Sequence, residues 1–320
     1  MPTESPLSIL VMGAGALGCV TGGLMAKDGH DLTFIGRAKQ IDAMNANGIT
    51  ITGIWGDHHT DTFSAVTSIN DAPKKHYDLI LLAVKSYDTE ATLPLLKPHV
   101  SDDTLIISYQ SGLGNAELIA AAYGWDRCVE ARVIFGARIT EPGIVDVTVM
   151  AHKTALGVYH HTPYLDKIKR IAEAMDASGV PTEFADNIAA VLWYKLAYNC
   201  SLNPLSALFD VPYANLLDTE DRKQTMCEVL QELYAVGHAL GIQLNPPTAA
   251  DYIDLLFGTL IPNTGTHYAS MREDVVHQKR TEIDSLNGAI VRHGKKHGIP
   301  CPTNARLTKA IREREAKERG

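Results

Sequence analysis

A glycine-rich turn near the N-terminus restricts the fold of this chain more than any other feature. Residues 7–12 form a short apolar run of β character, residues 13–18 read GAGALG, and an apolar helical pattern continues to residue 28. In a strand–GxGxxG–helix order, Gly13 permits the tight turn, Gly15 lets a pyrophosphate approach the backbone, and Gly18 lets helix and strand pack closely. The order predicts a Rossmann-type dinucleotide-binding domain, with a purely structural glycine turn as the alternative. The expected cofactor contacts in the turn are Gly13, Ala14, Gly15, Ala16, Leu17 and Gly18.

The residue after the second predicted strand indicates which dinucleotide binds. Residues 31–36 form that strand, and Arg37 follows it. NAD-selective sites usually place an acidic residue about 20 positions after the first glycine, where it binds the ribose 2′-hydroxyl. A guanidinium suits a 2′-phosphate, so Arg37 favours NADPH over NADH; the alternative is an exposed arginine after a strand.

Two later strands end in polar residues that suit the same cofactor. The apolar run 77–84 is typical of a strand buried in a parallel sheet, and it is followed by Lys85, a candidate second phosphate contact. The strand 104–108 leads through Ser111 into a helix that begins at residue 115. Ser111 is a candidate for hydrogen bonding to nicotinamide or substrate, or else an ordinary loop residue.

The remaining strand patterns complete an α/β domain over residues 1–185. Residues 49–52 and 59–66 read as an antiparallel excursion at the sheet edge, and further strands are expected at 128–135, 144–150, 154–159 and 180–184. Ala137 follows a glycine, so a cofactor could approach closely there. From residue 186 the strand signals vanish, and residues 186–320 are predicted to form an all-helical second domain.

Two polar features of the helical domain are candidates for chemistry. On the apolar helix that starts near residue 186, Lys195, Asn199 and Asn203 are spaced i, i+4, i+8 and share one flank. Glu282 is expected on a mixed apolar helix, where it could face a cleft. The structural alternatives are a lysine that extends to solvent with amides that bridge helices, and an exposed helical carboxylate.

Composition excludes several classes of function. The formal net charge of −8 argues against a nucleic-acid partner, and no apolar stretch reaches the length of a membrane span. The five cysteines are scattered without a CxxC pair, so neither a zinc site nor a disulfide framework is indicated. We expect a cytoplasmic protein that acts on a small molecule; the helical domain could also pair with a copy of itself.

These motifs together resemble the ketopantoate reductase (2-dehydropantoate 2-reductase) family over nearly the whole chain. The most specific segments are K-x-x-x-N-x-x-x-N-P-L at 195–205 and T-E-I-D-x-x-N-G at 281–288, behind GAGALG. The resemblance implies a Rossmann domain followed by a 6-phosphogluconate-dehydrogenase-like helical domain. It also implies NADPH-dependent reduction of 2-dehydropantoate to pantoate, a step of pantothenate and coenzyme A biosynthesis.

The resemblance also implies roles for individual residues. Lys195 matches the family's proton donor and Glu282 its second catalytic carboxylate, which also contacts cofactor. The matching substrate-binding positions are Asn199, Asn203 and Ser270, with Ser111 as a further candidate; the matching cofactor contacts are Arg37, Lys85 and Ala137.

The chain departs from the family pattern at two positions. Ser111 stands where many members have asparagine, and Tyr213 stands where some have a further substrate-contacting asparagine. Two alternatives therefore remain open. One is a reductase of another branched or bulky 2-oxo acid, and the other is a non-catalytic NADPH-binding sensor.

Overall fold

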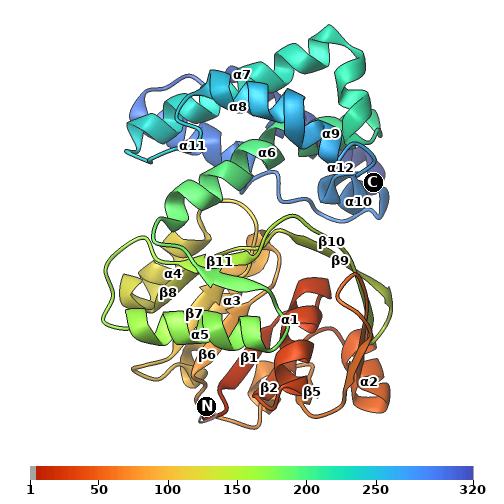
Figure 1. Cartoon of the computed structure of the whole chain (residues 1–320), viewed down its shortest axis with the longest axis vertical. Helices are drawn as coiled ribbons and strands as arrows, with labels where there is room; N and C mark the ends of the chain where they lie inside the picture. Colours follow the sequence, from red (N-terminus) through yellow and green to blue (C-terminus); the bar gives the residue numbers. More distant parts are fainter. Residues whose placement is uncertain (1–4, 320) are drawn as a thin grey trace. The chain divides into compact units, whose positions relative to one another are not determined.

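The computed structural model describes residues 5–319 and divides into two compact units (Figure 1). The first comprises Met1–Gln110 with Asn115–Ile188, and the second comprises Ser111–Gly114 with Ala189–Gly320. The chain thus leaves the α/β unit at residue 111 and returns to it at residue 115, so that a four-residue loop belongs to the helical unit.

The first unit is built on an eight-stranded sheet with the order β12-β11-β8-β7-β6-β1-β2-β5. All neighbouring strands are parallel except β8 and β11. The strands are β1 (Ser8–Met12), β2 (Asp31–Ile35), β5 (Ser64–Val66), β6 (Leu79–Leu82), β7 (Leu105–Ser108), β8 (Cys128–Arg132), β11 (Thr154–Gly157) and β12 (Thr182–Phe184). From β1 the chain builds outward to β5 and then returns to β6, so strand order reverses between β1 and β6. Ligands of open α/β sheets bind at such a reversal, beyond the carboxyl ends of the strands.

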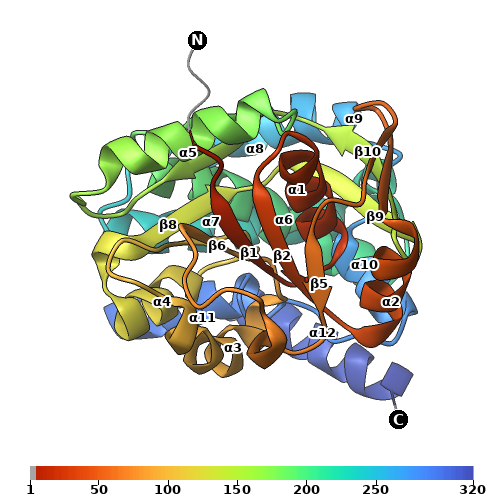
Figure 2. The same ribbon diagram turned by 90° about the horizontal axis from the view of Figure 1, so that it is seen from below.

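Helices cover both faces of this sheet, as Figure 2 shows. The helices are α1 (Ala16–Lys27), α2 (Ala38–Asn47), α3 (Thr89–Leu96), α4 (Asn115–Tyr123) and α5 (Leu165–Ala177). Successive residues of a strand point to opposite faces, and in β1 Ile9 and Val11 join the core cluster of α1 and α5, while Leu10 and Met12 join that of α3 and α4. This explains the continuous apolar runs that the sequence shows for the central strands.

A second, four-stranded sheet corrects two of the strand predictions. Its order is β4 (His58–Thr60), β3 (Ile49–Gly53), β10 (Ile144–Met150) and β9 (Phe135–Glu141). Strands β3 and β4 are antiparallel as predicted, but they do not extend the edge of the main sheet, and residues 64–66 pair with β2 instead. The predicted strand 128–135 divides into β8 and the start of β9. Val133 and Phe135 are both buried, so the apolar pattern continues across the point where the chain changes sheets.

Within the described residues of the second unit, all regular elements are helices, and turns and irregular segments connect them. Its helices are α6 (Ile188–Phe209), α7 (Glu220–Ala239), α8 (Ala249–Leu255), a π-helical turn (Leu256–Leu260), α9 (Ile261–Asn263), α10 (Ser270–Val276), α11 (Asn287–His297) and α12 (Pro302–Arg319). Helix α6 contributes fully buried residues such as Cys200 and Leu202 to the core of this unit. The prediction that Glu282 lies on a helix is wrong, because residues 282–286 form bends and turns and α11 begins only at Asn287.

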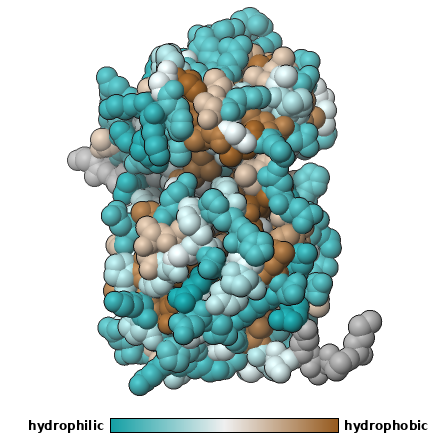
Figure 3. Space-filling model, turned by 90° about the vertical axis from the view of Figure 1, so that its left-hand side faces the viewer, coloured by the Kyte–Doolittle hydropathy of each residue, from teal (hydrophilic) through white to brown (hydrophobic). Residues whose placement is uncertain are grey.

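The surface is mainly polar on the face shown in Figure 3, where apolar residues gather in smaller areas between hydrophilic ones. Most of the large apolar side chains of both units lie in their core clusters, although a few, such as Ile54, Leu95 and Val276, are exposed. Within residues 5–319, no helix combines the length and apolar character that spanning a bilayer requires.

Candidate active site

The glycine-rich turn between β1 and α1 has the geometry that a nucleotide-binding loop needs. Gly13 has φ +119°, and a Cβ there would lie 2.7 Å from the Ala83 carbonyl carbon. A Cβ on Gly18 would lie 2.2 Å from the Gly13 carbonyl oxygen, whereas one on Gly15 would meet nothing within 4 Å. Two glycines are therefore required by close packing, and the third leaves open space before the N-terminus of α1. Backbone N–H groups at such a helix end favour phosphate.

The two predicted cations lie on either side of this turn. Strand β1 pairs with β2 on one side and with β6 on the other, so all three carboxyl ends meet at one edge of the sheet. Arg37 is the exposed N-cap residue of α2, just after β2. Gly36 lets this segment approach the turn, since a Cβ there would lie 2.6 Å from that of Ala14. Lys85 follows β6 and is partly buried.

The backbone that leads to Lys85 is held by Gln110, a residue that the sequence reading did not assign. Its side-chain Nε2 donates to the Val84 carbonyl oxygen at 2.8 Å and to the Thr89 hydroxyl at 2.8 Å. This ties the end of β6 to the start of α3. Ala137, the other predicted cofactor contact, lies on β9, a strand that packs against α1.

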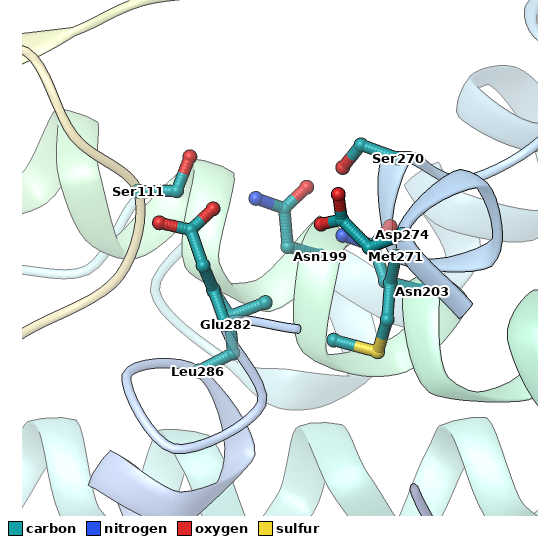
Figure 4. Close-up of a pocket in the computed structure, with 8 residues that line it drawn as sticks. All are labelled: Ser111, Asn199, Asn203, Ser270, Met271, Asp274, Glu282 and Leu286. Atoms are coloured by element: carbon teal, nitrogen blue, oxygen red, sulfur yellow. The ribbon is translucent and has the colours of Figure 1, made fainter. Parts of the chain in front are cut away.

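A polar pocket lies within the helical unit. Most of the side chains that line it are polar. The residues that line it are Ser111, Asn199, Asn203, Ser270, Met271, Asp274, Glu282 and Leu286 (Figure 4). Five of these were candidates from the sequence, and the structure brings them together from four separate segments. Among the described residues of the chain, no group of three His, Cys, Asp or Glu side chains could hold a metal ion.

Helix α6 supplies one wall of this pocket. Asn199 and Asn203 are one turn apart on it, and both line the cavity, as their spacing predicts. Lys195 is not one of the eight lining residues. It lies one further turn toward the helix N-terminus on the same flank, and its side chain is partly buried. A rise of about 1.5 Å per residue puts its Cα about 6 Å along the axis from that of Asn199, within reach of a long side chain.

The segment that carries Glu282 is irregular but firmly anchored. The Thr281 backbone N–H donates to Glu315 Oε1 at 2.7 Å, and Asn287 Nδ2 donates to the Cys200 carbonyl oxygen of α6 at 3.0 Å. Arg312 binds Asp284 through Nε at 2.9 Å; burial by itself would raise the pKa of this carboxyl, but Arg312 and Arg280 lower it. The motif residues around Glu282 are therefore mainly structural, and they hold the backbone from which its side chain reaches the pocket.

The loop that carries Ser111 is anchored to the same segment through Gly112. The Leu113 N–H donates to the Ser285 carbonyl oxygen at 2.8 Å. Gly112 has φ +88°, and a Cβ there would lie 2.4 Å from that oxygen. Only glycine allows this contact, so Gly112 sets where Ser111 lies relative to Glu282.

Gly112→Ala is therefore expected to lower kcat/KM about 10-fold or more, because the loop must move away from Ser285 and carry Ser111 with it. Gly114→Ala is the matched control. Gly114 has φ +103° but open space at its Cβ, so both variants carry backbone strain of about 1 kcal/mol and only one carries the clash. Steady-state kinetics of both variants, with thermal melts, separate the effects; equal activities would contradict this role of Gly112.

Three pocket residues were missed by the sequence reading: Met271, Asp274 and Leu286. The sequence could have indicated Asp274 as a pocket residue, because it lies four residues after Ser270 and therefore on the same face of α10. It is only 8% exposed. The two carboxylates of the pocket, Asp274 and Glu282, approach it from different elements (Figure 4).

Fold and site together define the class of the protein. A doubly wound parallel sheet with a glycine-rich dinucleotide turn precedes a helical unit that holds a small polar pocket, which is the arrangement of a dinucleotide-dependent oxidoreductase.

The chain belongs to the ketopantoate reductase PanE/ApbA family. The model described as "Ketopantoate reductase PanE/ApbA" matches residues 9–161, and its C-terminal counterpart matches residues 187–315. The 2-dehydropantoate 2-reductase of Aquifex aeolicus (strain VF5) is 34% identical over 97% of this chain and 97% of that protein. The predicted family and fold class are thus confirmed, and the chain is an oxidoreductase by family.

Solved structures agree with this assignment. A PanE/ApbA family ketopantoate reductase from Ralstonia eutropha JMP134 has a TM-score of 0.87 and 31% identity, covering 98% of this chain and 99% of that one. The fold is shared more widely. A D-mandelate dehydrogenase, solved with NADH and anilino(oxo)acetate, has a TM-score of 0.87 at 24% identity and covers 97% of this chain and 99% of that one.

Proposed function

We propose that this protein reduces 2-dehydropantoate to pantoate with NADPH, in pantothenate and coenzyme A biosynthesis. Residues 1–185 serve as the NADP-binding domain and residues 186–320 as the substrate and catalytic domain. The observation that carries the proposal is the polar pocket in the helical unit, whose lining includes Ser111, Asn199, Asn203, Ser270 and Glu282. Four of them, Asn199, Asn203, Ser270 and Glu282, match substrate-binding and catalytic positions of the family, and all five side chains line one pocket.

The residues of the α/β unit fit an NADPH molecule. The open space at Gly15 and the N-terminus of α1 receive the pyrophosphate, while Arg37 and Lys85 bind the 2′-phosphate from the ends of β2 and β6, the two strands that flank β1. When bound, NADPH supplies a hydride to the carbonyl carbon of the substrate. A guanidinium also forms two parallel hydrogen bonds to a phosphate, which favours NADPH over NADH.

Lys195 acts as the proton donor in this proposal. Addition of hydride to the keto carbon leaves a negative charge on the oxygen, and that oxygen takes a proton from the Lys195 ammonium to give the hydroxyl of the product. The ammonium also stabilises the developing charge before the transfer. Glu282 holds the ammonium charged and oriented, and solvent restores the proton afterwards.

The two amides of α6 and the hydroxyl of Ser270 orient the substrate. A 2-oxo acid presents carboxylate and carbonyl oxygens as hydrogen-bond acceptors, and amide N–H and hydroxyl groups donate to these. Binding from several sides fixes the keto carbon, and such fixed positioning accelerates a reaction between bound groups.

A substrate panel tests this function. The purified protein should oxidise NADPH with 2-dehydropantoate and give pantoate, with a kcat/KM at least about 10-fold above that for other branched or bulky 2-oxo acids. A higher kcat/KM for another acid would assign the protein to the rival reductase function. NADPH binding without turnover of any acid would favour a sensor.

A further inference from the structure

A buried tyrosine stands directly behind one amide of the pocket. Tyr213 is 2% exposed and is not one of the eight lining residues. Its hydroxyl donates to Asn203 Oδ1 at 3.0 Å, and this hydrogen bond is fully buried. The departure from the family at this position therefore does not alter the pocket by direct contact. It acts on Asn203, which is itself 4% exposed and lines the pocket.

Two aromatic neighbours and a backbone hydrogen bond hold Tyr213 in place. The Tyr198 ring lies edge-on to it, with centroids 5.7 Å apart and an interplanar angle of 88°, and the His267 ring lies 5.4 Å away. The Tyr213 backbone N–H donates to the His267 carbonyl oxygen at 3.0 Å. Tyr198 is fixed in turn by a 2.7 Å hydrogen bond between its hydroxyl and that of Thr264. These contacts place the hydroxyl of Tyr213 against Asn203.

We propose that Tyr213 is a positioning residue that fixes the Asn203 amide with its N–H group toward the pocket, so that this wall selects a hydrogen-bond acceptor of the substrate. The inference rests on the proposed function and extends it to substrate choice. An asparagine amide rotated by 180° exchanges its oxygen and nitrogen, and the two orientations have similar shapes. A hydrogen bond donated to Oδ1 from behind stabilises one of them.

In the hydrogen bond between Tyr213 and Asn203, the phenol hydroxyl is always the donor. Burial raises the pKa of Tyr213 well above its usual value, so the hydroxyl remains a protonated donor. With Oδ1 held by this donor, the Nδ2 group is the end left for the pocket. Figure 4 shows the nitrogen end of Asn203 on the side of Asn199 and Asp274. A ligand oxygen with a lone pair, such as a carboxylate or keto oxygen, fits there, and an ammonium or other donor does not.

Tyr213→Phe tests the inference, because it removes one hydroxyl and leaves the ring in place. We expect KM for the 2-oxo acid to rise about 5- to 20-fold, with kcat changed less and KM for NADPH unchanged, since the amide is then free to rotate. Tyr234→Phe is the matched control. It also removes one largely buried tyrosine hydroxyl from the helical unit, but that hydroxyl donates to the Pro246 carbonyl oxygen and Tyr234 does not line the pocket, so its KM should stay within about twofold of wild type.

A double-mutant cycle separates positioning from general packing. If Tyr213 acts through Asn203, then Tyr213→Phe should have almost no further effect on substrate affinity in an Asn203→Ala background. The same loss in both backgrounds, or an unchanged KM in Tyr213→Phe, would overturn the proposal. For each variant, KM is measured with the 2-oxo acid that the wild type prefers. The dissociation constant of the same acid is measured by calorimetry in the presence of NADP⁺. If the proposed function is wrong, the wild-type protein will not reduce 2-dehydropantoate. If only this inference is wrong, the wild-type protein will be active and the variants will not show the expected changes in KM.

Discussion

Lys195→Ala is expected to lower kcat by about 10²- to 10⁴-fold and to leave the dissociation constant of NADPH almost unchanged. The reason is that one ammonium both stabilises the charge on the substrate oxygen and supplies its proton, and alanine does neither. The residue lies in the helical unit, one turn from Asn199, whereas the predicted phosphate contacts lie in the α/β unit. Stopped-flow measurement of a single turnover, with a fluorescence titration of NADPH, checks both parts.

Lys309→Ala is a suitable control for this variant. Lys309 is an exposed lysine of α12 whose ion pair with Glu313, at 3.8 Å, lies at the surface, where such pairs contribute little. Its removal should leave kcat within about twofold of wild type. Loss of NADPH affinity in Lys195→Ala, or a kcat close to that of wild type, would show that Lys195 is not the proton donor.

The parts of the fold that follow from local sequence were predictable. The GAGALG turn requires glycines at fixed offsets between a strand and a helix, and the structure shows the close contacts that exclude a side chain at Gly13 and Gly18. The polar flank of α6 also follows from local sequence, because residues four apart on a helix share a face. Asn199 and Asn203 therefore line one pocket.

Features that depend on tertiary pairing were not predictable. The change of sheet between β8 and β9 leaves the apolar pattern of residues 128–135 unbroken, so nothing local marks it. Around Glu282 the apolar residues continue at helical spacing into α11, but Leu286 has ψ −107° and the helix starts after it. That segment is held by Glu315, Cys200 and Leu113, and these long-range contacts decide its shape.

Arg37→Ala is expected to weaken NADPH binding about 10- to 100-fold and to leave NADH binding nearly unchanged. The 2′-phosphate is the only group that distinguishes the two cofactors, and the variant removes its bidentate cationic partner. Lys85 still provides one positive charge from the end of β6, on the other side of β1, so the loss is partial and should deepen in the Arg37→Ala, Lys85→Ala double variant. Fluorescence titrations of both cofactors at low and high salt measure these constants.

A second basic residue near Arg37 provides the control for this prediction. Lys39→Ala removes a positive charge only two residues away, from the exposed surface of α2, and therefore controls for a general loss of electrostatic attraction. If Arg37 contacts the 2′-phosphate, the preference for NADPH over NADH should fall in Arg37→Ala and persist in Lys39→Ala. Equal weakening of NADPH and NADH by Arg37→Ala would mean that Arg37 contacts a group common to both cofactors. The preference would then depend on Lys85, whose replacement alone should abolish it.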